Sequence, residues 1–371
     1  MRPRPDQPNK ILVVRNDGLG DFILTLPLVA GLRNGFPHAT IDALVSPVVA
    51  QLAPNLPDIH RMVIDPGVLL KRHRKIHTPQ AAAEARKQLL EEIQQSAYDA
   101  VLFAYAEPAS AALAHRARIP LRIGPLRRSF FWRFNRFMTA SRKGSHRAEY
   151  ELNLELLRCV GINPAEVDST PTLALPESTI KLPKSPYVVM HPYKRSGTAL
   201  TWPLTDFARV AAAWSAAGIQ VVVIGDGEDE AILQKTFGGQ HGGSNSGPVT
   251  LETGRSLPET LHLIGHAALF VGNSSGPLHL AGLAQVPHVG FFPQNRVSAP
   301  ARWRTLPGKK APADISSYLL SPDFSRDCVR CDGTRCPHFN CVSAITIQQL
   351  ASAIQAWGLN ELAEPLASLG K

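Results

Sequence analysis

Short apolar runs with strand character alternate with helical patterns along almost the whole chain. In the first half, strand-like runs are followed by amphipathic stretches, and after a proline-rich segment at 163–186 the alternation starts again. Parallel strands need long crossover connections, usually helices, so this order favours parallel sheets with helices on both faces. The sequence therefore predicts an α/β protein with two doubly wound sheets.

The predicted elements divide between two halves of the chain. In the first half, strands are expected at 10–15, 41–45, 62–64 and 100–104, with helices at 22–35, 79–95 and 147–160. In the second half, strands are expected at 187–190, 220–224, 249–252, 269–271 and 288–292, with helices at 204–217, 228–237, 257–266 and 278–284. We predict domains at 1–165 and 187–345, a linker at 166–186 and a C-terminal helix at 346–371, where Thr346 and Gln349 have capping-box spacing.

Length and charge narrow the class of protein. The chain has 371 residues, enough for two domains, and no apolar run reaches the roughly 18 residues that span a bilayer. Its first residues, MRPRPDQPNK, lack the apolar core of a signal peptide. We therefore expect a soluble cytoplasmic protein. Its net charge of +9 favours an anionic partner such as a nucleotide, a nucleic acid or an acidic membrane surface.

The positive charge is concentrated between Arg116 and Ala148. This stretch has ten lysines and arginines, no aspartate or glutamate, and interleaved aromatic residues. The pattern favours a functional basic surface, and the alternative is a solvated basic face whose aromatics belong to the core. The candidate cations for binding an anionic ligand are Arg127, Arg128, Arg133 and Arg136.

A glycine turn follows the first predicted strand. The segment Asn16-Asp17-Gly18-Leu19-Gly20-Asp21 separates that strand from a helix. Glycines allow a tight turn and a close approach of the backbone to a ligand. A carboxylate at Asp21 is favoured by the N-terminal end of the helix and is a candidate general base. The alternatives are a simple helix cap and a dinucleotide site, which lacks the full glycine spacing here.

Three loops of the second half carry candidate ligands for a nucleoside diphosphate. Ser274, Ser275 and Gly276 open a helix, which suits phosphate oxygens, and His279 is expected on the same face or in the core. Glu228, with Asp226 behind it, follows a strand and is a candidate for ribose hydroxyls. The loop after the strand at 187–190 offers charge and hydroxyl groups at Lys194, Arg195, Ser196 and Thr198.

Four of the five cysteines cluster near the C-terminal end. Cys328, Cys331, Cys336 and Cys341 have the spacing C-x2-C-x4-C-x4-C, with His338 as a spare ligand. This spacing is typical of a zinc knuckle with cysteine in the histidine position. A structural zinc or iron site, reduced thiols and disulfides remain as alternatives, although cytosolic conditions disfavour disulfides. Cys159 stands alone in a helical pattern and is expected in the core.

Several of these segments together resemble glycosyltransferase family 9, the heptosyltransferases. The matching motifs are Gly20-Asp21 with Pro27, Tyr98-Asp99 before a strand, His191-Pro192 with Trp202-Pro203, and Ser274-Ser275-Gly276 followed by His279-Leu280-Ala281. The resemblance covers roughly residues 10 to 350. It implies a GT-B fold with two Rossmann-like domains facing a cleft and a C-terminal helix crossing back to the first.

The resemblance also implies an activity and its residues. Asp21 would be the catalytic base of an inverting, metal-independent transfer of heptose from ADP-heptose to the lipopolysaccharide core, with no cofactor required. Gly20 and the arginines of the basic stretch would bind the acceptor, lipid A with its inner core, at the inner face of the cytoplasmic membrane. The loops of the second half would bind the donor. No nucleic-acid partner is expected from this resemblance.

Two positions depart from the family pattern. Ser274 stands where relatives often have aspartate, and Leu200 stands where many have lysine. These departures leave another nucleotide sugar or a protein acceptor open within the same family. A zinc-knuckle nucleic-acid-binding protein and a nucleotide-sugar epimerase are rivals of other classes.

Overall fold

The computed structural model divides the chain into two compact units. The first comprises Met1–Ser145 with Glu149–Ala174, and the second His146–Ala148 with Leu175–Lys371. The boundary after Ala174 falls inside the segment predicted as the linker. The structure describes residues 7–70, 78–142, 146–177, 180–183, 186–193, 200–238, 249–324, 328–329 and 331–370.

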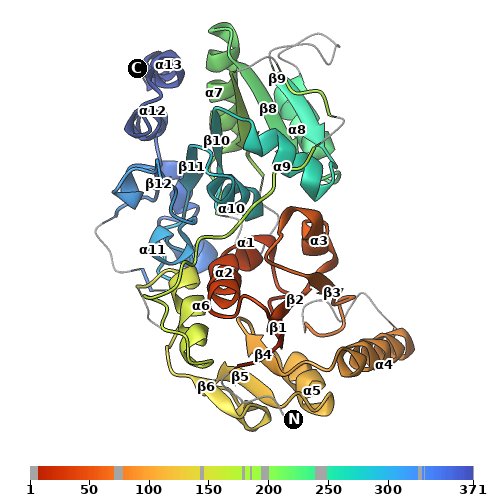
Figure 1. The fold of residues 1–371 in the computed structure, drawn as a ribbon. Coiled ribbons are helices and arrows are strands. Elements are labelled where there is room, and N and C mark those ends of the chain that lie inside the picture. Colours follow the sequence, from red (N-terminus) through yellow and green to blue (C-terminus); the bar gives the residue numbers. More distant parts are fainter. Residues whose placement is uncertain are drawn as a thin grey trace. The chain divides into compact units, whose positions relative to one another are not determined.

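The first unit is built on a six-stranded parallel sheet of order β3-β2-β1-β4-β5-β6 (Figure 1). Its strands are β1 (Lys10–Val14), β2 (Thr40–Val45), β3 (Arg61–Ile64), β4 (Ala100–Phe103), β5 (Leu121–Pro125) and β6 (Arg136–Met138). The register pairs Val13 of β1 with Ala43 of β2 and with Leu102 of β4. Strand order reverses at β1, so its carboxyl end lies at the topological switch point, where such sheets bind ligands.

The helices of the first unit differ from the prediction in three places. The helix expected at 22–35 is divided into α1 (Leu19–Ile23) and α2 (Leu26–Gly35), because Thr25 is the N-cap and Pro27 lies in the first turn of α2. Helix α5 (Pro108–Arg116), strand β5 and strand β6 were not predicted. The short helix α3 (Pro47–Ala50) was not predicted either, and the remaining helices are α4 (Pro79–Ser96) and α6 (Glu149–Arg158).

The second unit repeats the architecture with a parallel sheet of order β12-β11-β10-β7-β8-β9. Its strands are β7 (Tyr187–His191), β8 (Gln220–Gly225), β9 (Val249–Thr253), β10 (Leu269–Asn273), β11 (His288–Phe291) and β12 (Leu319–Leu320). Its main helices are α7 (Leu204–Ala216), α8 (Glu230–Phe237), α9 (Leu257–Gly265), α10 (Gly276–Leu283) and α11 (Pro300–Trp303). The strands predicted for this half are all present, and among the elements that were not predicted are the short β12 and α11.

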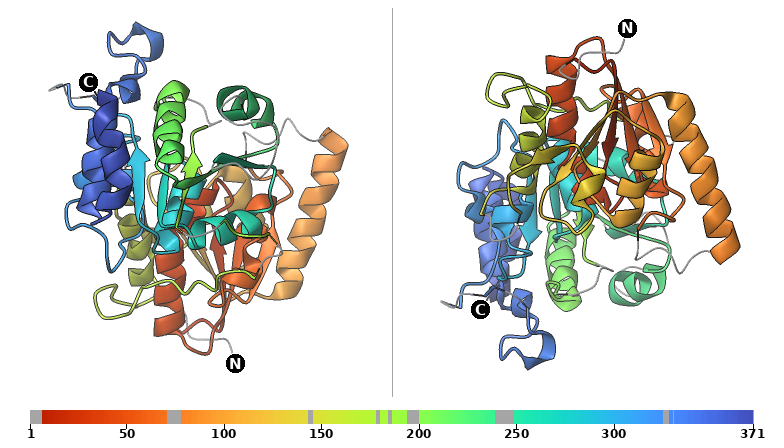
Figure 2. Two further views of the ribbon diagram at one scale, coloured as in Figure 1. Left: turned by 90° about the horizontal axis from the view of Figure 1, so that it is seen from above. Right: turned by 90° about the horizontal axis from the view of Figure 1, so that it is seen from below.

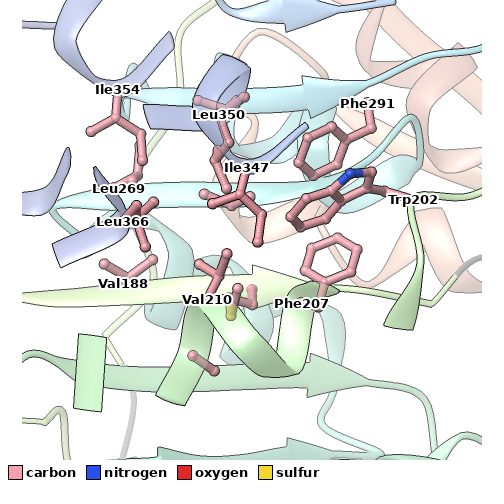
Figure 3. Close-up of a cluster of buried hydrophobic side chains, with 14 of the residues drawn as sticks. Val188, Trp202, Phe207, Val210, Leu269, Phe291, Ile347, Leu350, Ile354 and Leu366 are labelled. Atoms are coloured by element: carbon pink, nitrogen blue, oxygen red, sulfur yellow. The ribbon is translucent and has the colours of Figure 1, made fainter. Parts of the chain in front are cut away.

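The core of the second unit joins the sheet to helix α7 and to the C-terminal helices (Figure 3). Trp202 is stacked on Phe291 with ring centroids 4.4 Å apart, and it meets Phe207 edge to face. Leu350 and Ile354 complete this cluster from the C-terminal segment. The tryptophan of the Trp-Pro motif is therefore an anchor of the core, 1% exposed.

The residues predicted as one C-terminal helix form three short helices, α12 (Ile347–Ala356), α13 (Asn360–Ala363) and the 3-10 helix η8 (Glu364–Gly370). The capping box of Thr346 and Gln349 is formed at the start of α12. These helices, dark blue in Figure 2, pack against β11, β12 and α7 of the second unit. No helix among the described residues is long and apolar enough to cross a membrane.

The aromatic residues of the basic stretch divide between core and surface. Phe130 and Phe134 are buried against β4 and α5, with Phe134 packed on Phe103 at a centroid distance of 5.2 Å. Phe131 and Trp132 lie on the short 3-10 helix η3 (Phe131–Arg133) and remain 47% and 57% exposed. The prediction of a surface aromatic cluster is therefore wrong for Phe130 and Phe134, whose rings fill the space between the sheet and α5.

Candidate functional site

The turn after β1 places Asp21 beside a glycine that has no room for a side chain. Gly18 is the N-cap residue of α1, and no side chain caps this helix. A Cβ built on Gly18 would lie 2.6 Å from Oδ2 of Asp21. Glycine is therefore required at this position for Asp21 to keep its present rotamer, which leaves its side chain 28% exposed.

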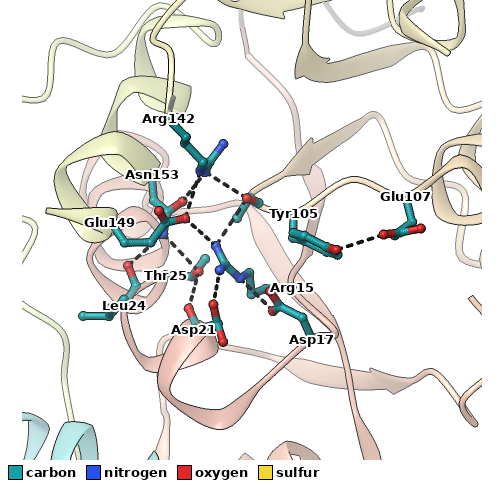
Figure 4. A network of polar contacts seen from close by, with 11 residues as sticks. Arg15, Asp17, Asp21, Leu24, Thr25, Tyr105, Glu107, Arg142, Glu149 and Asn153 are labelled. Atoms are coloured by element: carbon teal, nitrogen blue, oxygen red, sulfur yellow. Dashed lines mark hydrogen bonds and ion pairs between the residues drawn. The ribbon is translucent and has the colours of Figure 1, made fainter. Parts of the chain in front are cut away.

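A buried arginine, Arg15, fixes the carboxylate of Asp21 (Figure 4). Arg15, the residue after β1, is 3% exposed, and its Nη2 donates to Asp21 Oδ1 at 2.6 Å. Its Nε donates to Asp17 Oδ1 at 2.8 Å, and its Nη1 donates to Glu149 Oε1 at 3.0 Å. One guanidinium thus binds three carboxylates. This is possible because arginine presents its N–H donors in a fixed planar fork, which lysine does not have.

A second arginine ties this cluster to helix α6. Arg142 donates to Glu149 Oε1 at 2.9 Å and to Asn153 Oδ1 at 2.7 Å. Asn153 in turn donates to the carbonyl oxygen of Leu24 at 2.9 Å, at the break between α1 and α2. The turn that carries Asp21 is therefore fixed by side chains 120 to 135 residues away in sequence.

The charges of this cluster are strongly coupled. Burial lowers the pKa of Arg15, but Asp17, Asp21 and Glu149 outweigh burial and hold it above its ordinary value. Burial raises the pKa of Asp17, and Arg15 counteracts only part of this rise. The site therefore contains a permanent buried cation, Arg15, and one carboxylate of this cluster, that of Asp21, is accessible to solvent.

The first turn of α10 offers a candidate phosphate site in the second unit. Its N-cap residue Ser275 makes no side-chain cap, because its hydroxyl pairs with Nδ1 of His191 at 3.0 Å. Ser274 and Gly276 are half-buried beside it, and His279 is buried within α10. The structure thus brings together Ser274, Ser275, Gly276 and the end of β7, at the carboxyl edge of the sheet.

Asn273 joins the loops around this helix terminus. It is fully buried at the end of β10, its Oδ1 accepts from the backbone N–H of Trp202 at 2.8 Å, and its Nδ2 donates to the carbonyl of Pro192 at 2.7 Å. The His-Pro and Trp-Pro motifs are therefore fixed to one buried amide. Lys194, Arg195, Ser196 and Thr198, predicted for the loop between these motifs, lie outside the described residues.

Glu228 and its neighbours form a turn before α8. Glu228 is exposed, and its N–H donates to Asp226 Oδ1 at 3.0 Å, while the buried Asp229 accepts from the N–H of Asp226 at 3.2 Å. The exposed carboxylate of Glu228 is thus presented at the end of β8 by a turn that the other two residues stabilise.

The Tyr-Asp motif has a structural explanation at the other end of the first sheet. Asp99 accepts from the backbone N–H groups of Asn9 and Lys10, both at 2.9 Å, and fixes the start of β1. Tyr98 donates to Asp42 Oδ2 at 2.7 Å, and burial together with this bond raises the pKa of Tyr98 to about 12. This motif stabilises the sheet and lies far along the strands from Asp21.

The four predicted acceptor-binding arginines are in two different environments. Arg127 and Arg128 are exposed in the turn after β5. Arg133 donates to the carbonyl of Pro108, and Arg136 donates to the carbonyl of Cys159 at 2.8 Å. These contacts give Arg133 and Arg136 a structural role, and they leave Arg127 and Arg128 as the more accessible cations.

The clustered cysteines line a single cavity of about 280 Å³ in the second unit, together with His338 and Asn295. Within the described residues all five cysteines are present as thiols. Burial, with Cys331 and Cys336 nearby, raises the pKa of Cys341. No group of three or more described histidine, cysteine, aspartate or glutamate side chains is arranged to hold a metal ion.

Several residues of the site escaped the sequence analysis. Arg15 directly follows an apolar strand, and a charged residue at that position was the local sign that it belongs to a site. Glu149 and Asn153 have the i, i+4 spacing of one helix face, but nothing in their own neighbourhood marks them as partners of Arg15. Asn273 follows the apolar strand directly, as ligand-positioning residues of parallel sheets often do.

Comparisons with known proteins agree with this geometry. The model of glycosyltransferase family 9 (heptosyltransferase) matches residues 86–330. Lipopolysaccharide heptosyltransferase 3 of Escherichia coli is 25% identical over 288 residues, which cover 74% of this chain and 80% of that protein.

Two crystal structures show the same fold. The family 9 glycosyltransferase of Veillonella parvula has a TM-score of 0.71 at 18% identity, covering 98% of this chain and all of that one. The ADP-heptose lipopolysaccharide heptosyltransferase II of E. coli has a TM-score of 0.69 at 19% identity, with the same coverage. The fold is therefore GT-B. The loops that the sequence predicted to bind a nucleoside diphosphate follow strands of its second sheet, an arrangement that a nucleic-acid-binding protein would not explain. Because the family model spans well over half of the residues, the chain belongs to glycosyltransferase family 9, the heptosyltransferases, and is a glycosyltransferase.

Proposed function

We propose that this enzyme transfers heptose from ADP-heptose to the core oligosaccharide of lipopolysaccharide, with inversion at the anomeric carbon. The observation that carries the proposal is the solvent-accessible carboxylate of Asp21, held by the buried Arg15 at the switch point of the first sheet. The name of the E. coli relative, lipopolysaccharide heptosyltransferase 3, supports the choice of sugar and acceptor.

In the proposed reaction, Asp21 acts as the general base. Its carboxylate accepts the proton of an acceptor hydroxyl while the hydroxyl oxygen forms a bond to C1 of the sugar, and the bond between C1 and the diphosphate oxygen breaks. Arg15 already occupies Oδ1 of Asp21. Oδ2, on the side of Gly18, is therefore the oxygen that receives the proton. Gly20, which is buried in the first turn of α1, is proposed to contribute to the acceptor site through the backbone of this turn.

In the second unit, the donor diphosphate is proposed to lie at the first turn of α10. Its helix N-terminus and the hydroxyls of Ser274 and Ser275 stabilise the charge that develops on the leaving group. Lys194, Arg195, Ser196, Thr198 and His279 are proposed to add to this site, and Glu228 is proposed to bind the ribose. No cofactor or metal ion is needed for this step.

The experiment for this proposal is a panel of nucleotide sugars. Purified enzyme is incubated with ADP-heptose, ADP-glucose, UDP-glucose and UDP-N-acetylglucosamine, each with a truncated lipopolysaccharide acceptor, and products are identified by mass spectrometry. Transfer from ADP-heptose alone is expected. Transfer from a UDP-sugar, or none onto lipopolysaccharide, contradicts the proposal.

A second candidate keeps the reaction and changes the substrate. Leu200 is 6% exposed and packs in the core next to Trp202, so it offers no charge to a phosphate where relatives often have lysine. With Ser274 in place of an aspartate, the donor pocket has lost two charged groups of opposite sign. These departures favour transfer of a sugar from a different nucleotide sugar, or transfer to a protein acceptor.

For the acceptor, we propose that Arg127 and Arg128, with smaller contributions from Arg133 and Arg136, bind the phosphates of lipid A and its inner core. Leu126, Phe131 and Trp132 are exposed beside them. Aromatic side chains with neighbouring cations are typical of proteins that lie at a membrane interface. The enzyme would therefore work in the cytoplasm as a peripheral protein on the inner membrane.

We expect Gly276→Val to weaken ADP binding at least tenfold. A β-branched side chain at the first position of α10 would occupy the space next to the helix N–H groups that the phosphates approach. Calorimetry with ADP measures the change. The matched control is Ser256→Ala, which removes a side-chain cap from α9 in the same unit and should leave ADP affinity as it is. Equal affinity in the Gly276 variant would place the donor elsewhere.

We further propose a structural zinc or iron ion at the cysteine cavity. Four cysteines and His338 line one cavity, and thiolate and imidazole are the ligand types that zinc and iron take in proteins. The described side chains are not arranged around a metal position, so binding would require them to move together. Cys331→Ser with Cys336→Ser should abolish bound metal, measured by elemental analysis, and lower Tm. Cys159→Ser, outside the cavity, is the control. A protein purified without metal whose thiols react fully and whose Tm is unaffected by a chelator would contradict this proposal.

A further inference from the structure

The first unit has a groove between α4 and α5 that the proposed transfer reaction does not use. Two hollows, of about 290 and 630 Å³, share Leu90 of α4 and Arg116 of α5 in their walls, so they lie next to each other. The two helices contact each other and are neighbours at the lower right of Figure 1. We call this feature the α4–α5 groove.

The floor of the smaller hollow of the α4–α5 groove is apolar. Helix α5 contributes Ala109, Ala112 and Leu113, which recur at helical spacing along one face, and α4 contributes Leu90. Leu69, from the segment that precedes α4, closes one end. Covering an apolar floor of this kind with hydrocarbon removes it from water and is therefore favourable in free energy.

The rim of the groove is cationic. Arg86 and Lys87 line it from α4, and Arg116, Arg118 and Arg122 line the other hollow with His115. Among the described residues, no aspartate or glutamate lines either hollow. The carboxylates Glu84 and Glu91 are exposed on α4, three and four residues from Lys87, and neither of them lines the two hollows. The groove therefore selects for negative charge.

Exposed aromatic residues continue the same surface. The ring of Trp132 meets the ring of His115 edge to face at a centroid distance of 5.7 Å, so it stands directly beside the second hollow. Trp132 is 57% exposed and Phe131 is 47% exposed. Tryptophan is enriched where proteins meet the boundary between lipid headgroups and acyl chains.

We propose that the α4–α5 groove seats an anionic phospholipid of the membrane surface, with its phosphate at Arg116 and the first acyl carbons over Leu90 and Ala112. An apolar floor, a cationic rim and a neighbouring exposed tryptophan match the three parts of such a lipid at the interface. The proposal rests on the proposed function only in that a lipid-linked acceptor brings the enzyme to a membrane. The groove is separate from Arg127 and Arg128, proposed above for the acceptor.

Vesicle co-sedimentation tests the assignment. Wild-type protein is expected to bind mixed vesicles of phosphatidylglycerol and phosphatidylcholine and to dissociate from them as the salt concentration rises. It is not expected to bind vesicles of pure phosphatidylcholine. The triple variant Arg86→Gln, Lys87→Gln, Arg116→Gln should lose at least tenfold in binding. Its control is Arg209→Gln, Lys235→Gln, Arg255→Gln, which removes the same charge from the exposed surface of the second unit and should change binding less than twofold. Equal losses in the two variants would reduce the effect to net charge and overturn the proposal.

A second variant separates the groove from its rim. Ala112→Phe leaves every charge in place and fills the floor, so it should weaken binding of short-chain phosphatidylglycerol several-fold, measured by calorimetry. Unchanged lipid binding in this variant, or equally strong binding of inorganic phosphate to wild type, would overturn the acyl-chain part. Retention on polyglutamate without binding to phosphatidylglycerol vesicles would assign the groove to an acidic protein instead.

The proposed function is tested separately by ADP calorimetry on the wild-type protein. A protein that binds phosphatidylglycerol but neither binds ADP nor transfers a sugar would contradict the proposed function and leave the groove assignment standing. A protein that transfers heptose while the triple variant binds vesicles like its control would contradict the groove alone.

Discussion

Asp21→Asn should reduce turnover by about 100-fold or more, since positioned general bases contribute roughly 10²–10⁴ to the rate. Asparagine has nearly the same size as aspartate and cannot accept the proton of the acceptor hydroxyl. Asp21 is partly exposed, and the fold does not depend on burying it. Tm and ADP affinity should therefore stay close to those of wild type while kcat falls.

The matched control for this result is Asp17→Asn. Asp17 binds the same guanidinium, at 2.8 Å, but its side chain is only 8% exposed and cannot reach a substrate as Asp21 can. A much smaller loss of kcat is expected in this variant. If both variants lose activity equally, Asp21 acts by orienting Arg15 and the surrounding turn. If the turnover of Asp21→Asn stays within a few-fold of wild type, Asp21 has no catalytic role.

The regular part of this fold follows from local sequence. Strands such as β1 and β10 are apolar runs buried on both faces, and their limits agree with the prediction within about two residues. The division between α1 and α2 was missed because Phe22 to Gly35 keeps an apolar helical pattern through the break. Thr25 and Pro27 were the local signals that a new helix begins there.

Two of the missed elements, β5 and β6, are strands that contain a charged residue. β5 contains Arg122 and β6 contains Arg136, and alternation of these arginines with aromatic residues indicates a surface rather than a sheet. In the structure each guanidinium donates to backbone carbonyls, Arg122 to Ile119 and Arg133, and Arg136 to Cys159. Satisfied hydrogen bonds allow these cations to be half-buried, and no pattern within the strand itself reveals those partners.

The candidate site shows a similar limit. Asp21 and Ser275 could be found from the sequence because glycines and small hydroxyl residues directly after a strand have a recognised physical use. Arg15 and Glu149 could not be connected, because their contact joins residues 134 positions apart. Local patterns thus identify the groups that face a ligand, while the buried partners that orient them depend on the tertiary structure.

Arg15→Gln should lower the free energy of unfolding of the first unit by about 3–5 kcal/mol, the usual cost of removing one partner from a buried ion pair. Glutamine keeps part of the hydrogen bonding but leaves Asp17 and Glu149 without their cation in a buried site. Arg142 still contacts Glu149 at 2.9 Å, so Asp17 loses most. Urea unfolding followed by tryptophan fluorescence and circular dichroism measures the loss. Arg158→Gln, an exposed arginine paired with Glu155, should change stability by less than about 1 kcal/mol.

The loss in Arg15→Gln should also depend on pH in a defined direction. Burial already raises the pKa of Asp17 in the wild type, and removal of the guanidinium, which opposes this rise, should raise it further. A carboxyl with a raised pKa in the folded state contributes stability below its unfolded pKa, near 3.8, and loses it as pH rises through the folded value. The difference between variant and wild type should therefore be larger at pH 7 than at pH 4.5. A difference that stays constant over this range would mean that Arg15 stabilises the turn by packing and hydrogen bonds, with no role for its charge, and Arg15→Lys would then be no better tolerated than Arg15→Gln.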